Sequence, residues 1–207
     1  MLELREIYPI LLAISIISGC LMLALAFYVW RKYWLKRRMQ PARYLIFLML
    51  LMISWMFSFA LGLVIPDFSY KFFLEQFAYI GTILLCPTWF IFALQWTGKD
   101  KWLTTKKFSL IYIIPLLFLF LIFTDGLHHL IFTKVDFIFQ GSILLIDYGY
   151  SDLWWLLTLY CYFLILIGVF ILTKELISLR HIYRKQVVVL LVGTFAPWVA
   201  NIIYNPQ

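Results

Sequence analysis

The run YPILLAISIISGCLMLALAFYVW (Tyr8–Trp30) is followed at once by RKYWLKRRMQPAR (Arg31–Arg43), and this pairing sets the pattern of the whole chain. The first part carries no charge over a length at which a helix crosses a bilayer, for which roughly 20 apolar residues suffice. The second part is a dense basic cluster. Apolar spans separated by basic loops are typical of a protein whose solvent is lipid.

The composition supports the same interpretation, with 65% hydrophobic and only 13% charged residues, where a soluble domain has about 25% charged residues. Fourteen of the 17 Lys and Arg residues lie in Arg31–Arg43, Lys99–Lys107 and Lys174–Lys185. Because these stretches flank apolar spans, we interpret them as topology determinants beside anionic head groups. The net charge of +7 therefore predicts a membrane partner, the lipid bilayer, and no nucleic acid.

Six stretches are long and apolar enough to be transmembrane helices, and none shows the alternation of a barrel strand. Prolines interrupt three of them, at Pro87, Pro115 and Pro197. Each proline frees a backbone carbonyl that a neighbouring helix or a hydroxyl group must satisfy. The fold class is therefore an all-α membrane protein, a single transmembrane domain over residues 1–207 with spans at residues 8–30, 44–65, 72–96, 108–123, 153–173 and 187–204.

Charge predicts the orientation of these spans. The three basic loops hold 14 basic and two acidic residues, a balance of +12, whereas the other side has a balance of −5. Basic loops stay in the cytoplasm, so we expect a multi-pass protein of the cell membrane with an extracellular N-terminus. Six crossings leave residues 205–207 outside, and this parity indicates six helices of a seven-helix bundle, from a truncated chain or a naturally short product.

The longest non-apolar stretch on the predicted outer side is residues 125–152. Within it, Val135–Phe139 and Ile143–Asp147 are rich in β-branched and aromatic residues around Gln140–Gly141–Ser142. This pattern predicts a small extracellular β-hairpin between the fourth and fifth spans. An isolated hairpin is marginal in water, so we expect this one to cap the outer mouth of the bundle.

The chain has no sequence motif of an enzyme: no phosphate-binding glycine loop, no Gly-x-Ser-x-Gly and no His-Glu-x-x-His. We predict no catalytic residues, no metal and no cofactor. Cys20, Cys86 and Cys161 lie in three different spans and are interpreted as small packing residues. The span centres lack ionisable residues, which weakens an interpretation as a proton-coupled transporter.

Several polar residues remain as candidates for a binding site. Gln76 and Asn201 are amides within apolar spans, where an unpaired amide is costly, so each is a candidate for lining a cavity. His128 and His129 stand beside Asp125. The imidazoles can hydrogen-bond the hairpin at a helix end, and the alternatives of metal binding or pH sensing stay open.

Some motifs resemble a known family. They are PTWFIFALQWTG (Pro87–Gly98), TDGLHH (Thr124–His129), and Tyr148–Gly149 leading into Trp154–Trp155, with Pro197, Asn201 and Tyr204 after them. The chain resembles the N-terminal seven-transmembrane sensor region of bacterial and archaeal histidine kinases. The resemblance implies a sensory input module whose seventh helix continues into a PAS domain and then a kinase, with a homodimer expected from kinase logic.

Our leading hypothesis is a signal-sensing input domain of a two-component sensor histidine kinase that lacks the seventh helix and the kinase domains. The alternative is a small transporter or channel, or a membrane scaffold. The signal, a small molecule or a change in the membrane, stays unidentified. We expect it to bind an outer pocket whose candidate residues are Glu75, Gln76, Tyr79, Asp125, His128, His129, Trp154 and Asn201.

Overall fold

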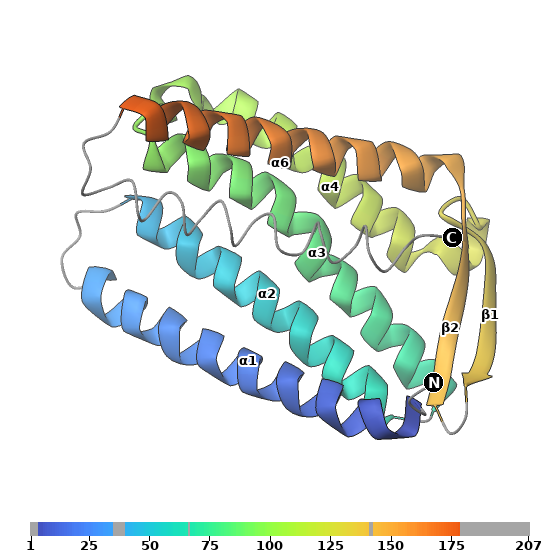
Figure 1. The fold of residues 1–207 in the computed structure, drawn as a ribbon. Helices are drawn as coiled ribbons and strands as arrows, with labels where there is room; N and C mark the ends of the chain where they lie inside the picture. The colour runs from blue at the N-terminus through green and yellow to red at the C-terminus, as the bar shows by residue number, and fades with distance from the viewer. Residues whose placement is uncertain (1–3, 35–39, 66, 141–142, 179–207) are drawn as a thin grey trace.

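The structure, a computed structural model, describes residues 4–34, 40–65, 67–140 and 143–178 (Figure 1). Five of its helices are long and apolar enough to cross a membrane. In chain order the elements are α1 (Leu4–Trp34), α2 (Gln40–Val64), α3 (Phe68–Trp96), η1 (Asp100–Trp102), α4 (Thr105–Phe123), α5 (Asp125–His128), β1 (Phe132–Gln140), β2 (Ile143–Tyr150) and α6 (Asp152–Ser178).

The mostly helical fold is confirmed, with a candidate membrane-spanning helix at each of the first five predicted spans and a hairpin after the fourth. The sixth predicted span, residues 187–204, lies outside the described residues. The third helix begins at Phe68, four residues before the predicted start, because the Asp67 side chain accepts a hydrogen bond from the Tyr70 amide at 3.1 Å and caps the helix. Lys71, which the sequence placed before the span, is consequently inside α3 and only 3% exposed.

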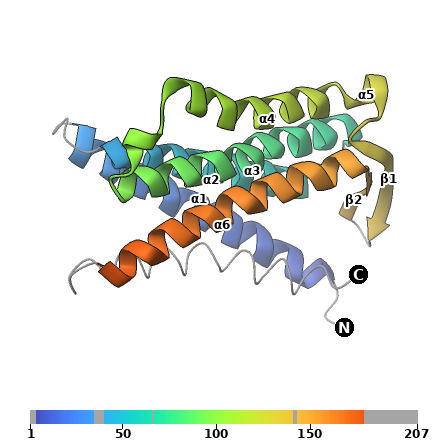
Figure 2. The ribbon, with the colours of Figure 1, turned by 90° about the horizontal axis from the view of Figure 1, so that it is seen from above.

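Helix α3 is the centre of the bundle. It packs against α2, α4 and α6, while α1 packs against α2. Figure 1 shows α1, α2, α3 and α6 side by side in this order, and in the view of Figure 2 α4 and α6 lie on opposite sides of α3. The last third of α3 is the most deeply buried part of this helix, with Ile91, Phe92 and Ala93 at 0% exposure.

Glycines allow the close approach of helices to α3. A Cβ atom added at Gly81 would lie 2.6 Å from the Leu51 carbonyl oxygen of α2. A Cβ atom at Gly168 of α6 would lie 2.8 Å from Nε1 of Trp89. Small residues let helix backbones come together where no hydrophobic effect drives them, as expected within a bilayer.

The backbone carbonyl that the proline in α4 leaves without a bond has a hydrogen-bond donor on another helix. Pro115 has no N–H, so the Ile111 carbonyl loses its bond within α4. The Tyr160 hydroxyl of α6 donates to that carbonyl at 2.7 Å. This contact confirms, for Pro115, the prediction that a neighbouring helix satisfies the freed carbonyl. Pro197 lies outside the described residues.

The hairpin lies across one end of the bundle (Figure 1). Its strands are antiparallel, with Val135 opposite Tyr148 and Phe137 opposite Ile146. Val135 and Tyr148 pack on the helices, whereas Asp147, the residue directly before Tyr148, is exposed. This period of two places one face of the hairpin against the bundle and the other toward solvent.

The Tyr160 contact can be tested by a double-mutant cycle. Tyr160→Phe should lower the free energy of unfolding by about 1 kcal/mol, because the Ile111 carbonyl then has no donor. Pro115→Ala restores the N–H within α4, so Tyr160→Phe should have a much smaller effect in that background. Unfolding of the purified protein in detergent measures both. Equal losses in the two backgrounds would contradict the assigned pairing.

Candidate functional site

The two ends of the bundle differ in chemistry. One end carries Lys99, Lys101 and Lys106 and is here called the basic end. There an ion pair joins the segment after α3 to α6, with 3.3 Å between Nζ of Lys99 and Oε2 of Glu175. The opposite end carries β1 and β2 and is called the hairpin end. Buried polar groups concentrate at the hairpin end, which makes it the candidate site.

Lys71 joins α3 to the end of α2. Its Nζ donates to the Gly62 carbonyl oxygen at 2.8 Å. Gly62 lies in the last turn of α2, where backbone carbonyls have no partner within the helix. A cation is favoured at this position because it also meets the negative end of the helix dipole.

Gln76 likewise joins α3 to the end of α4 by donating to a backbone carbonyl. Its Nε2 donates to the Ile122 carbonyl oxygen at 3.0 Å, and the side chain is buried with 8% exposure. Ile122 lies in the last turn of α4. The Gln76 amide, a candidate for lining a cavity, thus has a structural partner.

Asp125 holds the chain at the point where it enters β1. Its carboxylate is 2% exposed, and Oδ1 accepts hydrogen bonds from the amides of Ile131 at 2.8 Å and Phe132 at 3.4 Å. The Ser151 hydroxyl donates to the Leu130 carbonyl and so joins the end of β2 to the same segment. The base of the hairpin is therefore fixed by polar contacts.

The His128 imidazole belongs to this network, whereas His129 contributes its backbone amide, which donates to the Asp125 carbonyl at 2.8 Å. Nδ1 of His128 accepts from the Leu130 amide at 3.1 Å, and Nε2 lies 3.0 Å from the Thr124 hydroxyl. Because that hydroxyl donates to the Phe120 carbonyl, Nε2 carries the proton, and Nδ1 lies 3.7 Å from Oδ1 of Asp125. His129 is exposed and adopts a left-handed φ of 50°, so the two imidazoles have different roles.

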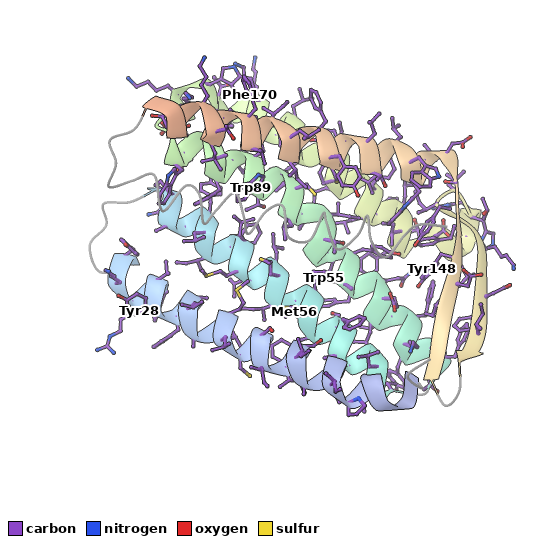
Figure 3. All side chains as sticks on the ribbon, in the orientation of Figure 1. Tyr28, Trp55, Met56, Trp89, Tyr148 and Phe170 are labelled. Carbon is purple, nitrogen blue, oxygen red and sulfur yellow. The ribbon has the colours of Figure 1, made fainter. Side chains whose placement is uncertain are left out.

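Above this network five aromatic rings from four elements form what we call the aromatic cluster. The Tyr79 and Trp154 centroids lie 5.3 Å apart at 72°, and Tyr150 stacks on Trp154 at 4.7 Å and 18°. Figure 3 shows Tyr148 at the hairpin end of the bundle. The cluster comprises Tyr79 of α3, Phe132 of β1, Tyr148 and Tyr150 of β2, and Trp154 of α6.

Glu75 lies one helical turn from Tyr79 on the same face of α3, since residues four apart are neighbours on a helix. Burial and then the negative charge of Glu75 raise the pKa of Tyr148 well above its ordinary value. Burial also raises the pKa of Tyr150. Both hydroxyls therefore stay protonated at neutral pH. The Tyr148 Oη atom is buried and has no hydrogen-bond partner among the described residues.

Comparison with known proteins identifies the family of this chain. Residues 14–207 match the N-terminal 7TM region of histidine kinase. The chain belongs to this family. No curated protein and no solved structure matches it.

Membership of the histidine kinase 7TM family makes the bundle a membrane domain linked to kinase signalling. The match covers the 7TM input region and thus includes the hairpin end, α3 and the basic end. The resemblance stated from the sequence motifs is confirmed.

The 7TM structure brings together only some of the residues that the sequence nominated. Tyr79 and Trp154 share the aromatic cluster, and Glu75 acts on Tyr79 electrostatically. Gln76 instead contacts the end of α4, and Asp125 the base of the hairpin. Asn201 lies outside the described residues. The family match does not test any of these predicted site residues, and their roles stay predictions.

Sequence reasoning gave no site role to three residues at the hairpin end. Tyr148 and Tyr150 are alternate residues of β2, and this alternation was the available signal that they share a face. Lys71 carried no such signal, because its burial depends on the end of α2 lying beside it.

We expect Asp125→Ala to loosen the base of the hairpin. The amides of Ile131 and Phe132 lose a buried acceptor, a loss that costs about 2 kcal/mol. Amide hydrogen exchange should show faster exchange at these two residues. Asp147→Ala, which removes an exposed carboxylate of the same hairpin, is the matched control and should leave their exchange unchanged. Equal acceleration in both variants would contradict the anchoring role.

Proposed function

We propose that this chain is the signal-receiving membrane domain of a two-component sensor histidine kinase, and that the hairpin end receives the signal. The observation that carries the proposal is the position of α3. Its first turns meet the hairpin through the Phe68–Phe137 contact, with centroids 3.7 Å apart, and through the Tyr79–Phe132 contact at 5.9 Å. The same helix contacts α2, α4 and α6.

A signal at the hairpin end therefore has a physical path into the bundle. A shift of the hairpin changes the packing around Tyr79 and Trp154, and α3 and α6 together carry this change toward the ion pair of Lys99 and Glu175 at the basic end. A ligand moves such an equilibrium only by binding one arrangement more tightly than the other. The proposal thus requires two arrangements of α3 and α6.

The charge distribution supports the orientation in which the hairpin end faces the outside. Lys101 and Lys106 are exposed at the basic end, and basic residues remain on the cytoplasmic side. Asp67 and Asp147 are exposed at the hairpin end. Downstream PAS and kinase domains, and a second copy of the chain, are the expected cytoplasmic partners.

Signalling output tests the sensing role. In a full-length histidine kinase that carries this chain, Glu75→Ala and His128→Ala should each shift the basal autophosphorylation rate about threefold or more without loss of expression. The reason is that a change of about 1 kcal/mol between two arrangements alters their ratio about fivefold. Asp147→Ala is the control for an exposed carboxylate at the same end. Unchanged output in both test variants would refute the proposed site.

Cysteine labelling in intact cells tests the orientation. We expect a membrane-impermeant maleimide to label Asp147→Cys and to leave Lys106→Cys unlabelled until the cells are lysed. Both positions are exposed, so the difference reports the side of the membrane. The protein with its native cysteines alone gives the background. The reverse pattern would place the hairpin end in the cytoplasm.

A further inference from the structure

We propose that Glu75 and the aromatic cluster form a binding site for a small organic ammonium cation. This inference rests on the proposed sensing role of the hairpin end and adds the chemical class of the ligand. It stands on three features of the described residues: the arrangement of the rings, a carboxylate without a donor, and a buried hydroxyl without a partner.

The rings offer electron-rich faces to a cation. Tyr79 and Trp154 stand nearly perpendicular, at 72°, and so form a corner, while Tyr150 of β2 stacks on one face of Trp154. Aromatic faces attract ammonium groups through the ring quadrupole, most strongly at Trp and where water is excluded. Tyr150 is 41% exposed, which gives the cluster access to water.

Two polar groups of the site, the Glu75 carboxylate and the Tyr148 hydroxyl, have no hydrogen-bond partner among the described residues, whereas the Tyr79 and Tyr150 hydroxyls bond to each other. Among the described residues, Glu75 forms no hydrogen bond and no direct ion pair, although it is half-buried and acts electrostatically on Tyr79, Tyr148 and Tyr150. The Tyr148 oxygen is buried without a partner. An ammonium group, which has donors and no acceptor, complements both.

Lys71 is a cation one helical turn from Glu75 and is already engaged. It acts on Glu75 electrostatically from one turn away, but its Nζ donates to the Gly62 carbonyl and its side chain is buried. Movement of Lys71 to Glu75 would leave that carbonyl without a donor, at a cost typical of a buried unpaired group. Lys71 therefore leaves the Glu75 carboxylate open to an external cation.

The same features disfavour other ligand classes. An anion would meet the negative charge of Glu75 and the negative faces of the rings. A metal ion prefers several oxygen, nitrogen or sulfur ligands, and within the described ranges no three His, Cys, Asp or Glu side chains gather to hold one. An organic cation uses the rings and the carboxylate together.

A ligand-observed NMR titration tests the proposal, with the full chain in nanodiscs of zwitterionic lipid and empty nanodiscs as the blank. The probe is n-propylammonium, and n-propanol is the neutral analogue. We expect saturable binding of the ammonium and none of the alcohol over the same concentrations. Equal binding of both probes, or no binding of the ammonium, would overturn the proposal.

Variants locate the site. Glu75→Gln should weaken binding of n-propylammonium about tenfold, because the charge is lost with little change of shape, and Tyr148→Phe about threefold, because one acceptor is lost. Their matched controls are Asp147→Asn and Tyr70→Phe, which change exposed side chains, and both should bind like the wild type. Unchanged affinity in Glu75→Gln, or an equal loss in Asp147→Asn, would overturn the proposal.

The sensing role is measured separately, by the basal output of the Glu75 and His128 variants with no added cation. Altered output together with absent ammonium binding would leave the sensing role intact and reject the ligand class. Ammonium binding that depends on Glu75, together with unchanged output, would support the cation site and reject the sensing role. The two proposals can therefore fail independently.

Discussion

The structure depends on the rule that a backbone carbonyl in or beside hydrocarbon must find a donor. Three side chains supply donors across helix boundaries: Lys71 to the end of α2, Gln76 to the end of α4, and Tyr160 to the carbonyl freed by Pro115. Two of these side chains lie on α3. Because α3 donates to a terminal carbonyl of each of these two helices, the ends of α2, α3 and α4 are held together at the hairpin end by polar contacts as well as by packing.

This constraint explains why the candidate site lies at the hairpin end. A two-stranded hairpin is marginal alone, and here it is held by the carboxylate of Asp125 and by the packing of Phe132 and Tyr148 on the helices. Phe132 and Tyr148 are themselves part of the aromatic cluster. Glu75, which is half-buried, forms no direct ion pair and thus has acceptor capacity that the described residues do not use.

The signalling interpretation follows from the same arrangement. The family match makes the chain the 7TM region of a histidine kinase, and the central helix α3 both contributes to the candidate site and packs on α2, α4 and α6. The polar contacts at Gly62 and Ile122 hold α3 to α2 and α4. In the signalling interpretation, a ligand that perturbs Tyr79 would therefore move α3 together with these two helices.

The sequence by itself determined the membrane class, the first five spans and the hairpin, because apolar length and strand alternation are local properties of the chain. It also nominated Glu75, Tyr79 and Trp154. Only the tertiary structure decided that Tyr79 meets Trp154, that Gln76 pairs with the Ile122 carbonyl, and that Lys71 of α3 is buried. The reason is that a polar side chain's role depends on which helix end lies beside it, and that neighbour is distant in the sequence.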